Sequence, residues 1–210
     1  DISYIHYPAL LDFDVRREGF AWKLYNAYVR RFVKKRFGNT RCGKVLTNSR
    51  WTASRIYLVY RVVPDVVYPP IDVEFFAKAR TNDVRERIVV TVSRFSPEKN
   101  LDKVLSVAAK LKDFWFYICG YVDEYSKSYF DYMIHLIDEM KLDNVILCPN
   151  IDRETLLKLF SKAMFYLHPQ YAEHFGMSIA EAMSAGLVPI VYRDGGAWTV
   201  SYTHLTLPTN

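Results

Sequence analysis

The chain lacks any long apolar segment, which argues against a membrane-spanning protein. Its longest apolar run, residues 114–122, is strand-sized, whereas a bilayer-crossing helix needs about 20 residues. No signal peptide is visible, but the chain opens on Asp1 instead of Met, so we expect an internal fragment. Half of the 210 residues are apolar, which is enough to bury a sizeable core in about one to two domains.

Cysteine and glycine motifs are also scarce. The three cysteines, Cys42, Cys119 and Cys148, are odd in number and far apart, so they suggest neither a disulfide framework nor a zinc cluster. They fit a reducing compartment and predict a cytoplasmic protein. There is no GxGxxG motif, since Gly120 stands alone after its expected strand, and this disfavours a nicotinamide-dependent dehydrogenase.

The charge distribution divides the chain into two parts. Residues 1–65 hold 13 Lys and Arg against 5 Asp and Glu, whereas the remainder is slightly acidic. The basic part reads as a strand (2–5), a long helix (17–37), a strand (44–47) and a helix (48–60). Residues 64–72 include Pro69 and Pro70, which favour an extended domain crossing.

From residue 87 onward the pattern alternates between strands and helices, which predicts an α/β fold with a parallel sheet wrapped by helices. Ligands of such sheets bind beyond the carboxyl ends of the strands. The expected strands lie near 88–93, 114–119, 144–148, 164–167 and 188–192, and the expected helices near 99–112, 125–141, 152–162 and 176–185.

Two carboxylates flank the start of the helix expected at 176–185. Glu173 lies in the preceding polar loop and Glu181 lies inside the helix. The free amides near Gly176, Met177 and Ser178, together with the helix dipole, could bind a diphosphate. Taken singly, Glu173 could be an ordinary first-turn acid and Glu181 a solvated residue. Because the helix is apolar on most sides, however, the Glu181 carboxylate would need a partner.

These residues resemble the donor-binding signature of glycosyltransferase family 4. The similar segments are EHFGMSIAEAMSAGLVP from Glu173, the pair Gly195-Gly196, and VTVSRFSPEKNLDKVL from Val90. The resemblance implies a GT-B fold, in which residues 66–198 form a truncated Rossmann-like nucleotide-sugar domain. Residues 1–65 would be the C-terminal remnant of a second, acceptor-side Rossmann-like domain. It also implies that Arg94 and Lys99 hold the donor diphosphate, a chemistry that suits an Arg fork and a Lys point charge.

Three further patches narrow the resemblance to a subgroup, the eukaryotic α1,2-mannosyltransferases that extend dolichol-linked oligosaccharides. They begin at Tyr4, Asn48 and Val67. The resemblance implies a retaining transfer of a hexose to a glycan or lipid-linked glycan, with mannose from GDP-mannose favoured over a UDP-sugar. Glu173 would hold sugar hydroxyls and Glu181 the ribose, while the turn ending at Ile151 would approach the base. His6 would lie near the donor sugar, although it could equally be a histidine satisfied near a turn.

No metal or other cofactor is expected. Asp12-Phe-Asp14 has the DxD form that other glycosyltransferase folds use to bind a metal, but it precedes a helix outside the donor domain. Helix N-capping is the better explanation for this triplet. Arg94, Lys99 and the helix dipole already supply positive charge for a diphosphate.

The segment 20–37 interleaves aromatic residues with six cations. It could rest peripherally on an anionic membrane face, but a helix packed in the acceptor-side domain with its cations in water is slightly favoured. One such patch does not support nucleic-acid binding. Residues 199–210 carry no charge and show no clear continuation of the pattern, so we expect a tail foreign to the fold.

Three rival interpretations remain. A sugar phosphorylase or nucleotide-sugar epimerase of GT-B architecture would share the diphosphate site. A donor-binding fragment without turnover would also fit, because most of the acceptor-side domain is missing. Finally, the basic aromatic segment 20–37 could bind a membrane surface, in which case the chain would be a membrane-surface binding fragment.

Overall fold

The computed structural model describes residues 2–7, 24, 27, 28, 31, 43–81 and 84–205. The chain divides into two compact units, Asp1–Pro69 and Pro70–Asn210. The division falls inside the proline-containing stretch 64–72, while the domain boundary expected after residue 65 stays a prediction.

Unit 1 contains a three-stranded parallel sheet in the order β1-β2-β3, with one described helix of defined bounds. Ser49 begins that helix, because its hydroxyl accepts a hydrogen bond of 3.1 Å from the Thr52 amide. The strands expected at 2–5 and 44–47 and the helix expected at 48–60 are confirmed. The bounds are β1 (Ile2–Ile5), β2 (Lys44–Thr47), α2 (Arg50–Tyr60) and β3 (Asp65–Val66).

Several predictions for unit 1 fall outside the described residues. The triplet Asp12–Asp14 and Cys42 are among them. Within the helix expected over 17–37, and within the segment 20–37 assigned to membrane contact, the structure describes only four positions. These four, Leu24, Ala27, Tyr28 and Arg31, are all helical.

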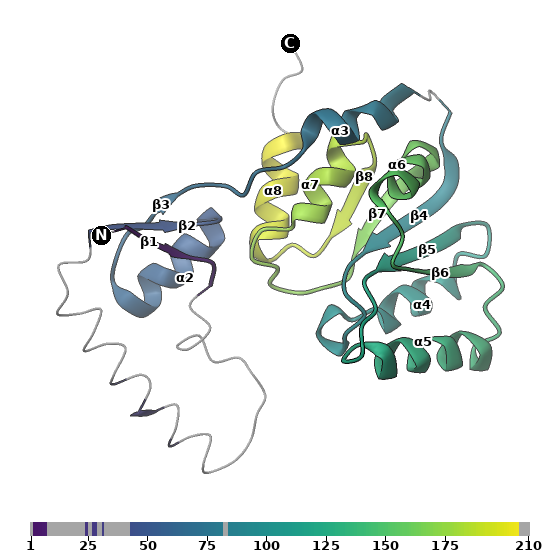
Figure 1. Cartoon of the computed structure of the whole chain (residues 1–210), viewed down its shortest axis with the longest axis horizontal. Coiled ribbons are helices and arrows are strands. Elements are labelled where there is room, and N and C mark those ends of the chain that lie inside the picture. The colour runs from purple at the N-terminus through teal and green to yellow at the C-terminus, as the bar shows by residue number, and fades with distance from the viewer. Residues whose placement is uncertain are drawn as a thin grey trace. The chain divides into compact units, whose positions relative to one another are not determined.

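Unit 2 is built on a five-stranded parallel sheet in the order β6-β5-β4-β7-β8 (Figure 1). All five strands were predicted, with ends that differ by at most two residues. The strand centres are rich in β-branched and aromatic residues, which suit a sheet covered on both faces. The bounds are β4 (Glu86–Val92), β5 (Trp115–Gly120), β6 (Val145–Pro149), β7 (Ala163–His168) and β8 (Val188–Val191).

Helices cover both faces of this sheet, with α4 and α5 on one face and α3, α6, α7 and α8 on the other (Figure 1). Leu105 of α4 and Met133 of α5 are fully buried in one core, while Phe160 of α6 and Ile179 of α7 are fully buried in the other. The bounds are α3 (Val73–Ala77), η1 (Lys78–Thr81), η2 (Pro97–Lys99), α4 (Asp102–Ala108), α5 (Lys127–Glu139), α6 (Arg153–Lys162), α7 (Met177–Ser184) and α8 (Gly195–Leu205).

The structure corrects two expectations about helices. The single helix expected over 99–112 is split, because Asn100 adopts a left-handed conformation (φ 52°) between η2 and α4. The expectation that no helix continues past Trp198 was wrong, since α8 continues to Leu205. The assignment of residues 199–210 to a tail foreign to the fold stays a prediction. Val200 and Ser201 are buried, so this uncharged stretch packs as a helix without the polar face that a sequence pattern would reveal. The short elements α3 and η1 were not predicted.

The strand order determines where a ligand can bind. The chain runs from β4 outward through β5 to β6, then returns to β7 on the other side of β4 and continues to β8. The connections that leave β4 and β7 therefore diverge to opposite faces of the sheet. Such a switch point opens a crevice at the carboxyl ends of the two strands.

Candidate functional site

The switch point carries most of the predicted donor-binding residues. Arg94 and Lys99 lie just after β4, and the loop from Pro169 to Gly176 follows β7. Glu173 lies in that loop. Because β4 and β7 are hydrogen-bonded neighbours, these two stretches, some 70 residues apart in sequence, meet at one edge of the sheet.

Lys99 reaches across this edge to the loop after β7. Its Nζ donates to Gln170 Oε1 at 2.5 Å and to Glu173 Oε2 at 3.4 Å. The Lys99 and Glu173 side chains are each only 17% exposed, so the pair is largely shielded from water. The structure thus brings together two residues that the sequence assigned to one site, and adds Gln170 to them.

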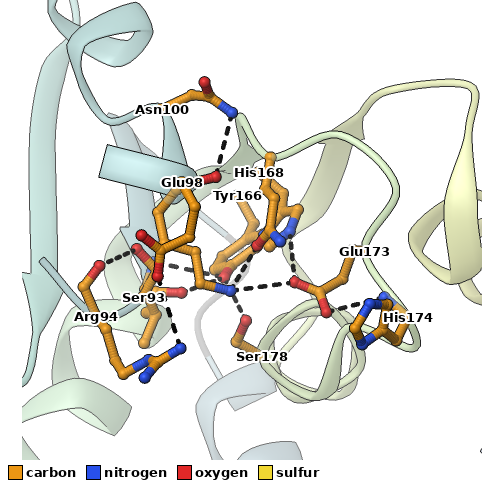
Figure 2. A network of polar contacts seen from close by, with 12 residues as sticks. Ser93, Arg94, Glu98, Asn100, Tyr166, His168, Glu173, His174 and Ser178 are labelled. Atoms are coloured by element: carbon orange, nitrogen blue, oxygen red, sulfur yellow. Dashed lines mark hydrogen bonds and ion pairs between the residues drawn. The ribbon is translucent and has the colours of Figure 1, made fainter. Parts of the chain in front are cut away.

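Two further groups contact the Glu173 carboxylate (Figure 2). His168 Nε2 lies 3.3 Å from Oε2, and the His174 amide donates a hydrogen bond of 3.0 Å to Oε1. Burial alone would raise the pKa of Glu173, but the His168 imidazole, the Lys99 ammonium and the His174 amide lower it to about 2. Glu173 is therefore ionised at neutral pH and able to accept hydrogen bonds.

Backbone geometry holds the Glu173 loop in place. Ala172 adopts a left-handed conformation (φ 49°), which few non-glycine residues tolerate. Gly195 and Gly196, at the start of α8, pack against the backbone of the same loop. A Cβ atom at Gly196 would overlap the His174 carbonyl group, so only glycine allows this approach.

Helix α7 presents its N-terminus next to this loop. Its N-cap residue, Gly176, has φ 92° and provides no side-chain hydrogen bond to the helix. The helix dipole and the first-turn amides can therefore act on an anion. The Ser178 hydroxyl lies 2.7 Å from the Tyr166 hydroxyl, which also donates to the Val92 carbonyl at 3.1 Å (Figure 2). The fully buried Tyr166 thereby ties β4, β7 and α7 together.

Arg94 lies at the open side of the site. Its side chain is 72% exposed, and its Nη2 atom lies 3.7 Å from Glu98 Oε1. An exposed pair of this kind contributes little to stability. The guanidinium can therefore leave Glu98 for a stronger anionic partner at small cost.

Glu181 lies four residues into α7, away from the Glu173 carboxylate network. Burial raises its pKa, the charge of Arg153 opposes this shift, and Asp72 adds to it. Arg153 is itself paired with Asp72 at 3.1 Å. Ile151, which was expected near the base, lies just before α6 and is packed against the core of unit 2.

His6 belongs to unit 1, where its ring contacts Tyr4 edge-on at 4.9 Å between centroids, and it is exposed. Its assigned role near the donor sugar stays a prediction. Within residues 2–7, 43–81 and 84–205, no group of three or more His, Cys, Asp or Glu side chains is arranged to hold a metal ion. No helix in the described part of the chain is both long and apolar enough to span a membrane.

Sequence reasoning missed two residues of the carboxylate network, His168 and Gln170. Both lie in a stretch that reads only as the end of a strand followed by a polar loop. A histidine at the end of a strand, five residues before an assigned carboxylate, offers a weak signal. Only the path of the loop turns that spacing into a contact.

The chain is similar to a known family and to several known proteins. Residues 72–200 match the family described as glycosyl transferases group 1. The chain is 30% identical over 168 residues to the GDP-Man:Man(3)GlcNAc(2)-PP-Dol alpha-1,2-mannosyltransferase of Xenopus tropicalis, covering 72% of this chain and 34% of that protein. It is 29% identical over 173 residues to a D-inositol 3-phosphate glycosyltransferase of Mycobacterium sp. (strain KMS), covering 72% of this chain and 39% of that protein.

Solved structures share the fold at lower identity. Sucrose-phosphate synthase from Thermosynechococcus elongatus superposes with a TM-score of 0.73 at 22% identity, over 93% of this chain and 50% of that one. WaaG, a glycosyltransferase involved in lipopolysaccharide biosynthesis, superposes with a TM-score of 0.68 at 17% identity, over 97% of this chain and 60% of that one. The expected GT-B fold is thereby confirmed. The chain spans between a third and two fifths of the length of the two curated relatives above.

Proposed function

The chain belongs to the group 1 glycosyl transferases, and from this premise we propose that it forms the donor side of a retaining hexosyltransferase. The donor would be a nucleotide-sugar, with GDP-mannose favoured over a UDP-sugar, and the acceptor a glycan or lipid-linked glycan hydroxyl. The observation that carries the proposal is the ionised Glu173, held beside Lys99 at the switch point of the sheet.

The proposed site residues would contact three parts of the donor: the diphosphate, the sugar and the nucleoside. Arg94 and Lys99 would neutralise the diphosphate, and the uncapped start of α7, at Gly176, Met177 and Ser178, would donate amides to it. These interactions strengthen as negative charge develops on the leaving diphosphate, which favours the transition state over the bound substrate. Cations and amides would do this work without a metal ion or other cofactor.

The remaining groups would recognise the sugar and the nucleoside. Glu173 would accept hydrogen bonds from sugar hydroxyls, and Glu181 would accept them from the ribose. Burial raises the pKa of Glu181, and two ribose hydroxyls would supply the partners that a half-buried carboxylate needs. The turn Pro149–Ile151 would approach the base, and His6 would approach the sugar from the acceptor-side unit.

Two names among the similar proteins support the donor assignment. Several relatives, including that of Xenopus tropicalis, are named for transfer from GDP-Man. A structural neighbour, HepE of Anabaena, was solved in complex with UDP and glucose. The mannosyltransferase names favour GDP-mannose. Our proposal also places the enzyme in the cytoplasm, on the cytosolic face of a membrane, with segment 20–37 as a candidate peripheral contact.

Thermal unfolding with nucleotides tests the proposal directly. We would titrate the chain with GDP, UDP and ADP and follow its melting temperature, and then repeat the titration with Glu181→Ala. A GDP-selective increase that the variant loses would support the donor site, because the ribose would have lost its carboxylate partner. A cooperative melt that no nucleotide shifts would refute it. Glu139→Ala, an exposed change on α5, serves as the control.

A binding result alone leaves three kinds of protein open. Released sugar phosphate would identify a phosphorylase, and an epimerised donor would identify an epimerase. Binding without donor hydrolysis or transfer would identify a donor-binding fragment. Transfer of the hexose to a glycan acceptor would establish the proposed reaction.

A further inference from the structure

His168 belongs to the Glu173 network, but the proposed function gives it no role. It is the last residue of β7, its side chain is 3% exposed, and its Nε2 lies 3.3 Å from Glu173 Oε2 (Figure 2). Its ring stacks on that of Tyr166 at 16°, with 6.5 Å between centroids. His168 is thus held by β7, an interior strand of the sheet, whereas Glu173 is carried by a loop.

The contacts of His168 point to a single polar partner. Across residues 2–7, 43–81 and 84–205, neither ring nitrogen makes a hydrogen bond of good geometry, although both are fully buried. The Nε2 contact to Glu173 is therefore close but imperfectly aligned. A buried ring nitrogen without a well-aligned hydrogen bond costs free energy. A better aligned bond to Glu173 would recover part of that cost.

The Lys99 ammonium cannot pair equally well with the Glu173 carboxylate and with a diphosphate. In the structure its Nζ is shared between Gln170 and Glu173. A bound diphosphate would carry more negative charge than the carboxylate and would draw the ammonium toward itself. Glu173 would then lose a cation and gain an anionic neighbour, and both changes raise a carboxyl pKa.

We propose that His168 is a positioning residue that keeps Glu173 ionised and oriented when a donor diphosphate draws Lys99 away. The Nε2–H group of the imidazole, 3.3 Å from Oε2, would align with this oxygen and donate to it as Lys99 leaves the same oxygen. Glu173 then remains an acceptor for sugar hydroxyls instead of becoming a protonated donor. This role rests on the proposed function, because it assumes a diphosphate at Lys99.

The surroundings of the carboxylate make the effect specific. The ionisable groups that act on Glu173 are Lys99 from η2 and His168 from β7, with the His174 amide as the remaining donor. Tyr166 of β7 also experiences the charges of Glu173 and Glu181. With Lys99 engaged elsewhere, His168 is the one side chain among these that can still donate to Oε2.

The test is a pH titration of the Glu173 carboxyl group by carbon-13 NMR, assigned with Glu173→Gln, in the chain with and without GDP. His168→Phe fills a similar volume but removes the donor, and His168→Gln restores an N–H donor. We expect His168→Phe to raise the Glu173 midpoint by about one pH unit or more, with a larger shift when GDP is bound. We expect His168→Gln to return the midpoint toward that of the wild type.

A sugar-dependent readout accompanies the titration. In His168→Phe, the affinity for GDP-mannose relative to GDP should fall as the pH is lowered through the new midpoint, while GDP binding itself persists. His135→Phe, at an exposed position of α5, controls for the loss of an imidazole. If His168→Phe proves unstable, His168→Leu, which also lacks an N–H donor, takes its place in the comparison with His168→Gln and the wild type.

The outcomes separate this inference from the proposed function. An unchanged Glu173 midpoint in a folded His168→Phe variant would overturn the positioning role, as would equal shifts in the Phe and Gln variants. If no nucleotide binds, but the midpoint rises in His168→Phe and recovers in His168→Gln, the His168–Glu173 coupling stands and the donor site is refuted.

Discussion

The backbone amide of Gly196 donates a hydrogen bond of 2.5 Å to the carbonyl oxygen of Glu173. The first turn of α8 therefore holds the loop that carries the candidate sugar-binding carboxylate. A Cβ atom at position 196 would overlap the His174 carbonyl group, so the contact depends on glycine.

We predict that Gly196→Ala displaces this loop and weakens nucleotide-sugar binding. The added methyl must push the His174 backbone away, which moves Glu173 from Lys99 and lowers the melting temperature by several degrees, as expected for about 1–3 kcal/mol. Calorimetric titration with GDP-mannose and a thermal melt would measure both effects. Wild-type affinity together with a wild-type melt would contradict the assigned contact.

The low pKa of Glu173 predicts a specific pH dependence of stability. Its folded pKa of about 2 lies below the ordinary value of 4.5, so its contribution is fully present above pH 4.5 and is lost as the pH falls toward 2. Glu173→Gln should reduce the free energy of unfolding by about 1–3 kcal/mol at pH 6 and flatten its decline in acid. Urea unfolding between pH 3 and pH 6 checks this.

Glu139→Gln is the matched control for that experiment, because Glu139 is exposed on α5. It should leave the pH dependence of the wild type almost unchanged. Parallel curves for wild type and Glu173→Gln would mean that the Glu173 carboxylate is not stabilised in the folded chain.

Arg85 lies just before β4 and Arg87 lies within it, but the two side chains should differ sharply in how much they stabilise the fold. Arg85 donates to the carbonyls of Ala185 (2.8 Å) and Ala163 (3.2 Å) and also to that of Phe160, whereas Arg87 makes an exposed 3.5 Å pair with Asp113.

Arg85→Met would leave several helix-end carbonyls without partners and should cost about 2–4 kcal/mol, while Arg87→Met should cost about 1 kcal/mol or less. Chemical denaturation of both variants makes the comparison. Equal losses would show that Arg85 does not clamp the ends of α6 and α7.

Lys99→Met should weaken GDP binding about tenfold or more, because it removes a charged partner of the diphosphate from a shielded site. Lys110→Met, at the exposed C-terminal side of α4, provides a matched loss of charge and should have little effect. Fluorescence or calorimetric titration in the same buffer compares them. Equal affinity for the Lys99 and Lys110 variants would remove Lys99 from the donor site.

The periodicity of unit 2 predicted its sheet because each strand is a short apolar run bounded by turn residues. The helix α7 was also readable, since Gly176 precedes it and Gly186 follows it. Gly186 adopts φ 87°, and the Leu187 amide donates to the Ala182 carbonyl, which completes a glycine-terminated helix end. Local chemistry of this kind is visible within a few residues of sequence.

Other features had no local signal. Helix α8 extends past Trp198 with apolar and neutral residues on all sides, so no amphipathic pattern marks it. The left-handed Asn100 divides a stretch that reads as one helix. In α8, where Val200 and Ser201 are buried, packing against the rest of unit 2 overrides the local pattern.

The sequence by itself determined the alternation of strands and helices, the parallel sheet, and the chemical identity of the residues after β4 and β7. These follow from hydrophobic period and turn chemistry, which act over a few neighbouring residues. Only the tertiary structure decided that Lys99 and His168 share one oxygen of Glu173 and that Gly196 supports the same loop. Such contacts join residues up to 74 positions apart, and the strand order and close backbone approach that create them leave no local trace.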